Sequence, residues 1–224
     1  MSRVLSLVAM FVIGLPAGAD AGAWPRAAGT GFFSVTQELV ERDDDTITAY
    51  TSFHAEYGLS ERLTFGVKGG GTDTGRTYEV LAFARYPVGL AWGDNLFALE
   101  LGAGVRSKPG GGRETLIQPG FAWGRSFDTR WGPGWIGVET TFGHGMTTKD
   151  LWGKSDLTIG LSPDTKSHLI LQVQMYDNGV DTIVSLAPSY VRRMKGDLKV
   201  ELGLVHPLVG NKSTGLKAGT WLEW

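Results

Sequence analysis

Cysteine is absent from this chain of 224 residues, which excludes a disulfide framework, thiol chemistry and a lipoprotein anchor. An excess of one charge is also missing, since 21 Lys and Arg stand against 23 Asp and Glu and the formal net charge is −2. Without a basic excess, nucleic acid is not an expected partner. Downstream of the N-terminal leader, no apolar run approaches the roughly 18 residues of a transmembrane helix.

Motifs for enzyme chemistry are lacking too, so we expect no enzyme, no cofactor and no metal site. The four histidines show neither a His-x-x-x-His spacing nor a close acidic cluster. An outer-membrane lipid hydrolase needs a serine beside a histidine, but His144 is followed by Gly145 and Met146. Glu100 and Glu139 resemble the two carboxylates of a glycosidase only in residue type. If the chain forms a barrel, as the alternation described below predicts, acidic side chains in its interior are usually partners of Lys and Arg.

The N-terminus has the layout of a secretory signal. Arg3 supplies the positive charge, residues 4–15 form an apolar core of twelve residues, and small residues follow up to Ala23. A helix of twelve apolar residues is too short to span a bilayer, which argues against a membrane anchor. Cleavage after Ala19, Ala21 or Ala23 fits the A-x-A rule, and we favour Ala21. The predicted domains are a signal peptide at 1–21 and a barrel at 22–224.

The rest of the chain alternates apolar and polar side chains in segments of roughly ten residues. Such a segment is a strand with one apolar and one polar face. Together with polar turns, the alternation predicts strands at about residues 30–41, 46–58, 63–72, 77–87, 95–107, 114–126, 134–145, 154–162, 167–177, 181–192, 197–207 and 214–224. The predicted fold is all-β: a single closed antiparallel up-and-down transmembrane barrel of about 12 strands.

Two packings fit alternating strands. A soluble periplasmic sandwich would bury the apolar faces, whereas an outer-membrane barrel turns them to lipid and lines its lumen with the polar faces. Aromatic side chains at strand ends favour the barrel, because interfacial girdles are placed there. They are Tyr57, Tyr86, Trp92, Trp123, Trp131, Trp135, Trp152, Tyr190 and Trp224. We therefore expect Leu101, Val138, Leu171 and Leu202 to face lipid.

The polar faces carry glycine and charge deep within the strands. Glycines recur there at 66, 70, 102, 104, 120, 124, 143, 160, 203 and 219, which predicts an interior short of space. The predicted lumen-facing charge network comprises Glu38, His54, Glu56, Lys68, Glu79, Arg85, Glu100, Arg106, Glu139, Lys199, Glu201, Lys217 and Glu223. Seven Glu against five Lys and Arg give a lumen of mixed polarity with a mild preference for cations.

Hairpin register organises part of this network. In an antiparallel pair, the numbers of directly opposed residues have a constant sum. One register, centred at Trp92–Gly93, opposes Glu79 to Arg106 and Arg85 to Glu100. A second register, centred at Asp73–Thr74, opposes Lys68 to Glu79 and predicts one row of Lys68, Glu79 and Arg106. Unpaired charge in a narrow lumen is costly, so pairing is expected.

Three segments resemble known outer-membrane barrels. The last strand ends on an aromatic residue, Trp224, and resembles the signal that the barrel-assembly machinery recognises, where Phe is usual. Residues 56–67 resemble a strand, tight periplasmic turn and strand unit. The opening Gly22-Ala23-Trp24-Pro25-Arg26, with Gly29-Thr30-Gly31, is similar to uncharacterised proteobacterial barrels, including the group named after the MetA pathway of phenol degradation. These resemblances imply the cell outer membrane as location and its lipid and the assembly machinery as partners.

The favoured function is a passive channel or binding barrel for small polar solutes. Twelve strands fall between side-chain-filled barrels of eight strands and open porins of sixteen. One alternative is a structural barrel closed by its own internal salt bridges. Others are a lipid hydrolase whose site faces the bilayer and a soluble periplasmic β protein.

Overall fold

The computed structural model describes residues 22–41, 47–73, 75, 77–89, 93–108, 111–210 and 213–224. The predicted signal peptide and Trp92 lie outside these ranges. In the part of the chain that is described, no helix is long and apolar enough to cross a membrane.

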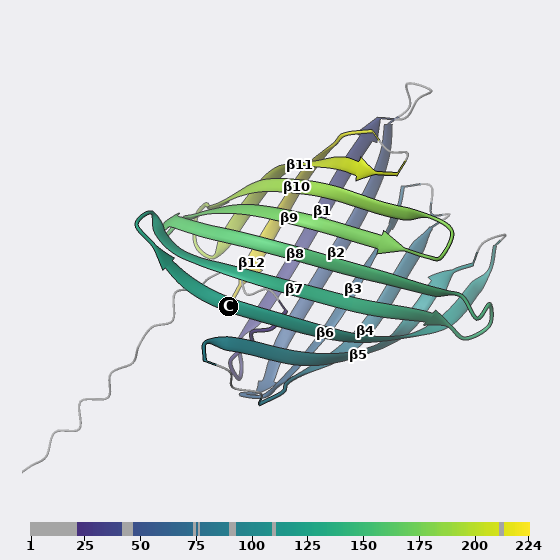
Figure 1. The fold of residues 1–224 in the computed structure, drawn as a ribbon, viewed down its shortest axis with the longest axis horizontal. Coiled ribbons are helices and arrows are strands. Elements are labelled where there is room, and N and C mark those ends of the chain that lie inside the picture. The colour runs from purple at the N-terminus through teal and green to yellow at the C-terminus, as the bar shows by residue number, and fades with distance from the viewer. Residues whose placement is uncertain are drawn as a thin grey trace, which may run out of the picture.

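The chain forms a closed antiparallel barrel in which every strand pairs with its neighbours in sequence and β1 pairs with β12 (Figure 1). The strands are β1 (Gly31–Glu41), β2 (Ile47–Ser60), β3 (Leu63–Thr72), β4 (Tyr78–Pro87), β5 (Asn95–Ser107), β6 (Arg113–Thr129), β7 (Gly132–Gly145), β8 (Leu151–Asp164), β9 (Ser167–Asp177), β10 (Thr182–Arg193), β11 (Leu198–Val209) and β12 (Gly215–Glu223). The predicted all-β barrel of twelve strands is confirmed.

Two predicted turns are in fact parts of strands. Gly132 and Pro133 pair with Thr129 and Asp128, so β6 and β7 run further and meet in a tighter turn. Pro163 likewise lies within β8, next to an irregularity in the pairing of β8 with β9. Proline is tolerated at such positions because the ladder there does not require its missing N–H.

The barrel closes where its two ends meet. The backbone N–H of Gly31 donates to the carbonyl of Trp224 (2.9 Å), and the N–H of Trp224 donates back to Gly31 (3.2 Å). The indole of Trp224 covers Gly31, where a Cβ would overlap the ring, and remains 58% exposed. Trp224 thus lies on the outer face at the seam, and its role as an assembly signal stays a prediction.

Apolar side chains cover the outer face. Leu101 and Leu202 are each 60% exposed and Leu171 is 44% exposed. Val138 belongs to the same face, because its neighbours across the ladder are Trp123 and the exposed Leu157. The outward orientation predicted for these four side chains is therefore correct, and it is the orientation a lipid-facing surface requires.

Placing an arginine on this face should destabilise the barrel in a bilayer. Leu171→Arg is expected to lower the free energy of unfolding by roughly 2–4 kcal/mol, since the outer face has no water to hydrate the charge. Gln174→Arg on the inner face of the same strand, beside Asp156 on β8, is the matched control and should cost under about 1 kcal/mol. Urea titration in phosphatidylcholine liposomes measures both, and equal costs would contradict the inside-out assignment.

Large rings fill the space that interior glycines leave. The indole of Trp152 lies over Gly143, that of Trp135 over Gly160, and the ring of Phe83 over Gly66. Both tryptophans are buried, at 4% and 6% exposure, so their predicted place in an interfacial girdle is wrong. They point inward because a glycine on the neighbouring strand makes room there. The girdle residues Tyr57, Tyr86, Trp131, Tyr190 and Trp224 are exposed on the outer face.

Candidate functional site in the barrel interior

Both chain ends of the described structure lie at one end of the barrel, called here the termini end. The connections that follow β1, β3, β5, β7, β9 and β11 lie at the opposite end. In Figure 1 the C-terminus marks the termini end, and the opposite end is to the right.

Residues 22–28, called here the N-terminal segment, fill the barrel at the termini end. Ala23 is buried against Ala98 of β5 and Ala122 of β6, and Trp24 packs on the same cluster. The ring of Trp24 occupies the space beside Gly124, where a Cβ would overlap it. The absence of a side chain at Gly124 of β6 therefore makes room for Trp24 of the segment.

Arg26 ties this segment to the interior. Its Nε donates to Oε2 of Glu56 at 2.9 Å, and its backbone N–H donates to Oγ1 of Thr64 at 3.1 Å. The guanidinium also lies over the ring of Phe32, 4.8 Å from the centroid. The sequence analysis missed Arg26, because it precedes the first strand and no alternation assigns it to a face.

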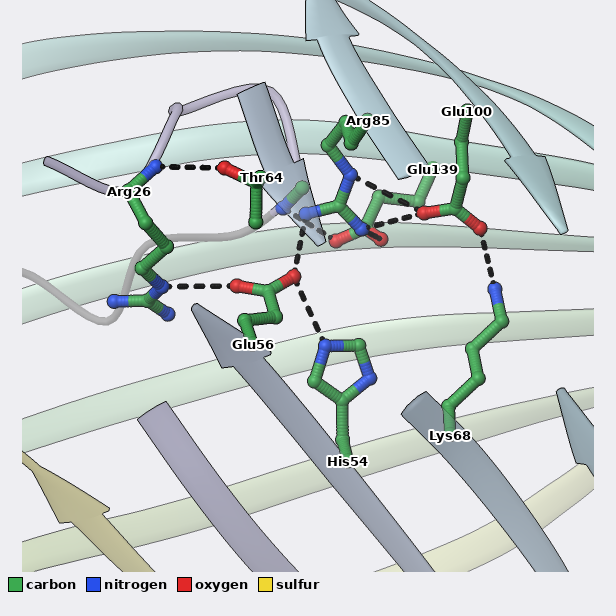
Figure 2. A network of polar contacts seen from close by, with 9 residues as sticks. Arg26, His54, Glu56, Thr64, Lys68, Arg85, Glu100 and Glu139 are labelled. Atoms are coloured by element: carbon green, nitrogen blue, oxygen red, sulfur yellow. Dashed lines mark hydrogen bonds and ion pairs between the residues drawn. The ribbon is translucent and has the colours of Figure 1, made fainter. Parts of the chain in front are cut away.

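Arg85 joins three carboxylates from three other strands (Figure 2). Its Nη1 lies 2.6 Å from Glu56 on β2 and its Nη2 lies 2.8 Å from Glu100 on β5. Glu139 on β7 is further away, at 3.8 Å from Nη2. The fork of donors on a guanidinium suits such sharing, since several carboxylates can each face a different N–H.

Lys68 and His54 extend the network toward the opposite end. Nζ of Lys68 lies 2.6 Å from Glu100, and Nε2 of His54 lies 2.9 Å from Glu56. The ring of Phe83 lies beneath both, 5.1 Å from Nζ of Lys68 and 5.4 Å from the His54 ring centroid. The central network is defined here as Arg26, His54, Glu56, Lys68, Arg85, Glu100 and Glu139.

One of the two predicted registers is wrong. The β4–β5 pairing opposes Glu79 to Arg106 and Arg85 to Glu100, as predicted. The β3–β4 pairing opposes Lys68 to Leu81, so Lys68 and Glu79 are not partners. The connection is longer than predicted: Thr72 N–H bonds the carbonyl of Thr77, which moves the hairpin centre along the chain by one residue.

The predicted row of Lys68, Glu79 and Arg106 therefore does not form. Arg106 bonds Glu114 of β6 at 2.7 Å and Asp150 at 3.1 Å, although its Cα is opposite that of Glu79. Nζ of Lys154 on β8 is the nearest cation to Glu79, at 3.8 Å. The β4–β5 register correctly predicted which Cα atoms are opposed. The strands of the barrel are tilted, however, so the side chains of Glu79 and Arg106 contact other partners instead of each other.

A second group of contacts lies near the opposite end. Glu114 accepts hydrogen bonds from Arg106 and from the backbone N–H and hydroxyl of Thr148. The guanidinium of Arg106 stacks on Trp152 at 3.7 Å from the ring centroid. The sequence analysis did not select Glu114, yet the register rule would have found it, because Glu114 is directly opposite Arg106 across the β5–β6 hairpin.

β11 and β12 carry four further residues of the predicted charge network. Lys199 lies 2.8 Å from Glu223, and Lys217 lies 2.9 Å from Glu201, which also accepts from the indole N–H of Trp221 (3.1 Å). Lys199 is only 1% exposed. Glu38 lines the interior nearer the opposite end. The thirteen residues of the predicted network thus all lie on the inner face, but in several separate pairs and clusters.

A larger and a smaller cavity lie in the interior of the described barrel. The larger one, of about 1920 Å³, reaches the connections at the opposite end. Three carboxylates and four basic side chains line it: Glu38, Glu79, Asp156, Arg106, Lys108, Arg113 and Lys154. The smaller one, of about 260 Å³, is lined by Gly22 and Arg26 of the N-terminal segment together with Glu56, Arg85 and Glu139. No described residue lines both cavities, although Asp156 of the larger cavity is directly opposite Glu139 of the smaller one.

A serine and a histidine are in contact near the termini end. Ser162 Oγ lies 2.8 Å from Nδ1 of His168, which is buried and stacks edge-on against Trp135. A hydrolytic triad needs a third group that orients the histidine. Among the described residues, none has a hydrogen bond to the other ring nitrogen that would supply this role. Nor do the described residues include three or more His, Cys, Asp or Glu grouped to hold a metal ion.

The closed barrel of twelve strands is similar in fold to solved structures of outer-membrane channels and porins. The COG4313 outer membrane channel from Pseudomonas putida F1 matches with a TM-score of 0.64 at 8% identity, covering 92% of this chain and 100% of that chain. The KdgM porin matches at 0.58 and 8% identity (85% and 98% covered), and the NanC porin at 0.57 and 10% (86% and 98%). No protein-family model and no curated protein matches the sequence.

Proposed function

We propose that this protein is an outer-membrane channel or binding barrel for small polar solutes. The observation that carries the proposal is the cavity of about 1920 Å³, which extends from the connections of one barrel end to Asp156, directly opposite Glu139. Its wall combines charges of both signs with aromatic rings such as Tyr50 and Tyr176. Such a wall offers hydrogen bonds to polar solutes and imposes no filter of a single sign.

The outer face of the barrel supports a location in the outer membrane. The outer face is apolar with exposed aromatic residues at the termini end, as a bilayer requires. An even number of strands puts both termini on one side, which in bacterial barrels is the periplasm. The larger cavity would then open to the outside of the cell. The three similar structures reported above are named as two porins and an outer membrane channel, which agrees with a non-enzymatic function.

A structural barrel is the second candidate, and one observation favours it. The N-terminal segment and the central network together occupy the interior between the larger cavity and the termini end. A barrel closed in this way would bind solutes without conducting them. The similarity of the opening residues to the MetA-pathway group is also part of this proposal. It involves Gly22–Arg26, which belong to the N-terminal segment.

Ion conductance of the refolded protein in planar bilayers tests the channel function. Glu79→Gln should shift the selectivity of the pore toward anions by roughly twofold or more, because it removes one of the three cavity carboxylates. Asp181→Asn, an exposed position in a connection at the same end, is the matched control and should leave selectivity unchanged. Absence of any conductance would favour the structural barrel, and equal effects of both variants would exclude Glu79 from the conducting path.

A further inference from the structure

The first described residue has its backbone nitrogen inside the charge network. The nitrogen of Gly22 donates to Oε1 of Glu139 at 2.7 Å, and Gly22 is itself buried. The carboxyl group of Glu139 is 39% exposed and lies 3.8 Å from Arg85. Arg85 bonds Glu56 and Glu100 at shorter distances than it does Glu139. Among the described residues, the Gly22 nitrogen is therefore the nearest donor to Glu139.

In the described part of the chain, Glu139 has no close side-chain cation, unlike the other carboxylates of the central network. Glu56 is contacted by Arg26 and Arg85, and Glu100 by Lys68 and Arg85, all within 2.9 Å. The contact of Glu139 with Arg85 is 3.8 Å long, and a further carboxylate, Asp156, is directly opposite Glu139 on β8. A positive charge at the Gly22 nitrogen would therefore stabilise Glu139, because a poorly paired charge in a barrel interior is costly.

We propose that the exported chain is cut between Ala21 and Gly22, and that the α-ammonium group released at Gly22 forms an internal ion pair with Glu139. Hydrolysis by a signal peptidase consumes one water molecule. The carboxylate leaves with Ala21, and the amine of Gly22 takes up a proton. The new ammonium places a positive charge beside Glu139, whose contact with Arg85 is 3.8 Å long. This inference does not depend on the protein being a channel.

Packing distinguishes this cut from the two other sites that fit the A-x-A rule. Cleavage after Ala23 would remove Ala23, which is 1% exposed and fills the space between Ala98 and Ala122. Cleavage after Ala19 would keep Asp20, a further carboxylate two positions from Gly22. It would also leave an uncharged peptide N–H where the ammonium is needed.

Glycine suits the position in a second way. A Cβ built at Gly22 would overlap the carboxyl group of Glu139. Any larger residue would displace the Glu139 carboxyl group from its present position 3.8 Å from Arg85. The absence of a side chain at residue 22 therefore favours the close approach of this nitrogen to Glu139.

N-terminal sequencing and intact mass of the protein purified from outer membranes test the cut. The full chain with its own leader is expressed in a Gram-negative host, and the mature protein is expected to begin at Gly22. A mature chain that begins at Asp20, Trp24 or Met1 would overturn the proposal.

Chemical labelling tests the ion pair. A free α-amine with its usual pKa of about 8 reacts with an amine-selective ester near neutral pH, whereas an ion-paired ammonium reacts more slowly because less of it is deprotonated. We expect Gly22 of the folded protein to be labelled about tenfold more slowly than in urea, a difference equivalent to about 1.4 kcal/mol. Equal rates in the folded and unfolded protein would refute the pair, and this comparison needs no variant.

Glu139→Gln distinguishes the ion pair from simple burial. This change keeps the shape of the side chain and should bring the folded labelling rate close to the rate in urea. Glu223→Gln is the matched control, because Glu223 is an interior carboxylate paired with Lys199 at 2.8 Å. It should leave the rate at Gly22 slow. Slow labelling in both variants would show that burial alone protects the amine and would overturn the proposal.

Discussion

Replacing Arg85 with methionine is expected to be the most destabilising single change in the barrel, at roughly 3–5 kcal/mol. Arg85 lies 2.6 Å from Glu56 and 2.8 Å from Glu100, and the side chains of all three are at most 7% exposed. Removing the cation takes away the one partner that the two buried carboxylates share, and leaves Glu56 with Arg26 and His54 and Glu100 with Lys68 alone. Urea unfolding in liposomes measures the effect.

Arg125→Met is the control for this prediction. Arg125 is half exposed and lies 3.8 Å from Asp94, a loose surface pair of little energetic value. Its replacement should change the free energy of unfolding by no more than about 0.5 kcal/mol. Similar effects of the two arginine variants would mean that the central network contributes nothing particular to stability.

Exchanging the charges of Arg85 and Glu100 is expected to recover little of this loss. The two residues are directly opposed, so the register alone would predict that Arg85→Glu with Glu100→Arg restores a pair. Arg85 is also bonded to Glu56, however, and the exchanged carboxylate would face Glu56 at short range. A double variant as stable as the wild type would show that the contact with Glu56 is dispensable.

Removing the N-terminal segment is expected to have the largest effect on conductance. With the predicted leader fused directly to Gly29, the barrel would lose the residues that fill its termini end, including Trp24 and Arg26. Conductance in planar bilayers should rise several-fold, because the smaller cavity would then open at that end. The barrel itself should still form, since the segment adds no strand to the closed ladder.

Two point variants refine this experiment. Arg26→Gln removes the ion pair with Glu56 while keeping the chain length, and should give an intermediate conductance with more frequent openings. Ala28→Gln, an exposed position in the same segment, should behave like the wild type. If the shortened protein folds and conducts no better than the full one, the segment is not the barrier.

The fold was predictable because the alternation of apolar and polar side chains is repeated in twelve strands, and an error in the bounds of one strand does not affect the others. A misplaced turn at Pro133 or Pro163 shortens one strand but does not change which face its side chains occupy. Register was less predictable, because it depends on the length of each connection. The β4–β5 register was predicted correctly, whereas the β3–β4 register was wrong by one position of the hairpin centre.

The site was predictable only as a set of inward-facing residues. Sequence spacing assigned Arg85 and Glu100 to each other, and the structure brings them together. Contacts across non-adjacent strands, such as Lys68 with Glu100 or Lys154 with Glu79, follow from the curvature of the closed barrel. Arg26 has no strand to fix its direction, so only the three-dimensional structure could place it. The same holds for Trp135 and Trp152, which turn inward over glycines.

The position of the N-terminal segment also bears on the order in which the barrel assembles. Its contacts reach Glu56 of β2, Ala98 of β5, Ala122 of β6 and Glu139 of β7, so all of them can form once the seventh strand is in place. β1 follows this segment directly and must later find β12, at the far end of the sequence. If the N-terminal segment is already docked on β2–β7, less entropy is lost when β1 finally pairs with β12. The segment that fills the finished barrel can therefore also act as an internal template, because it holds β1 in position to pair with β12.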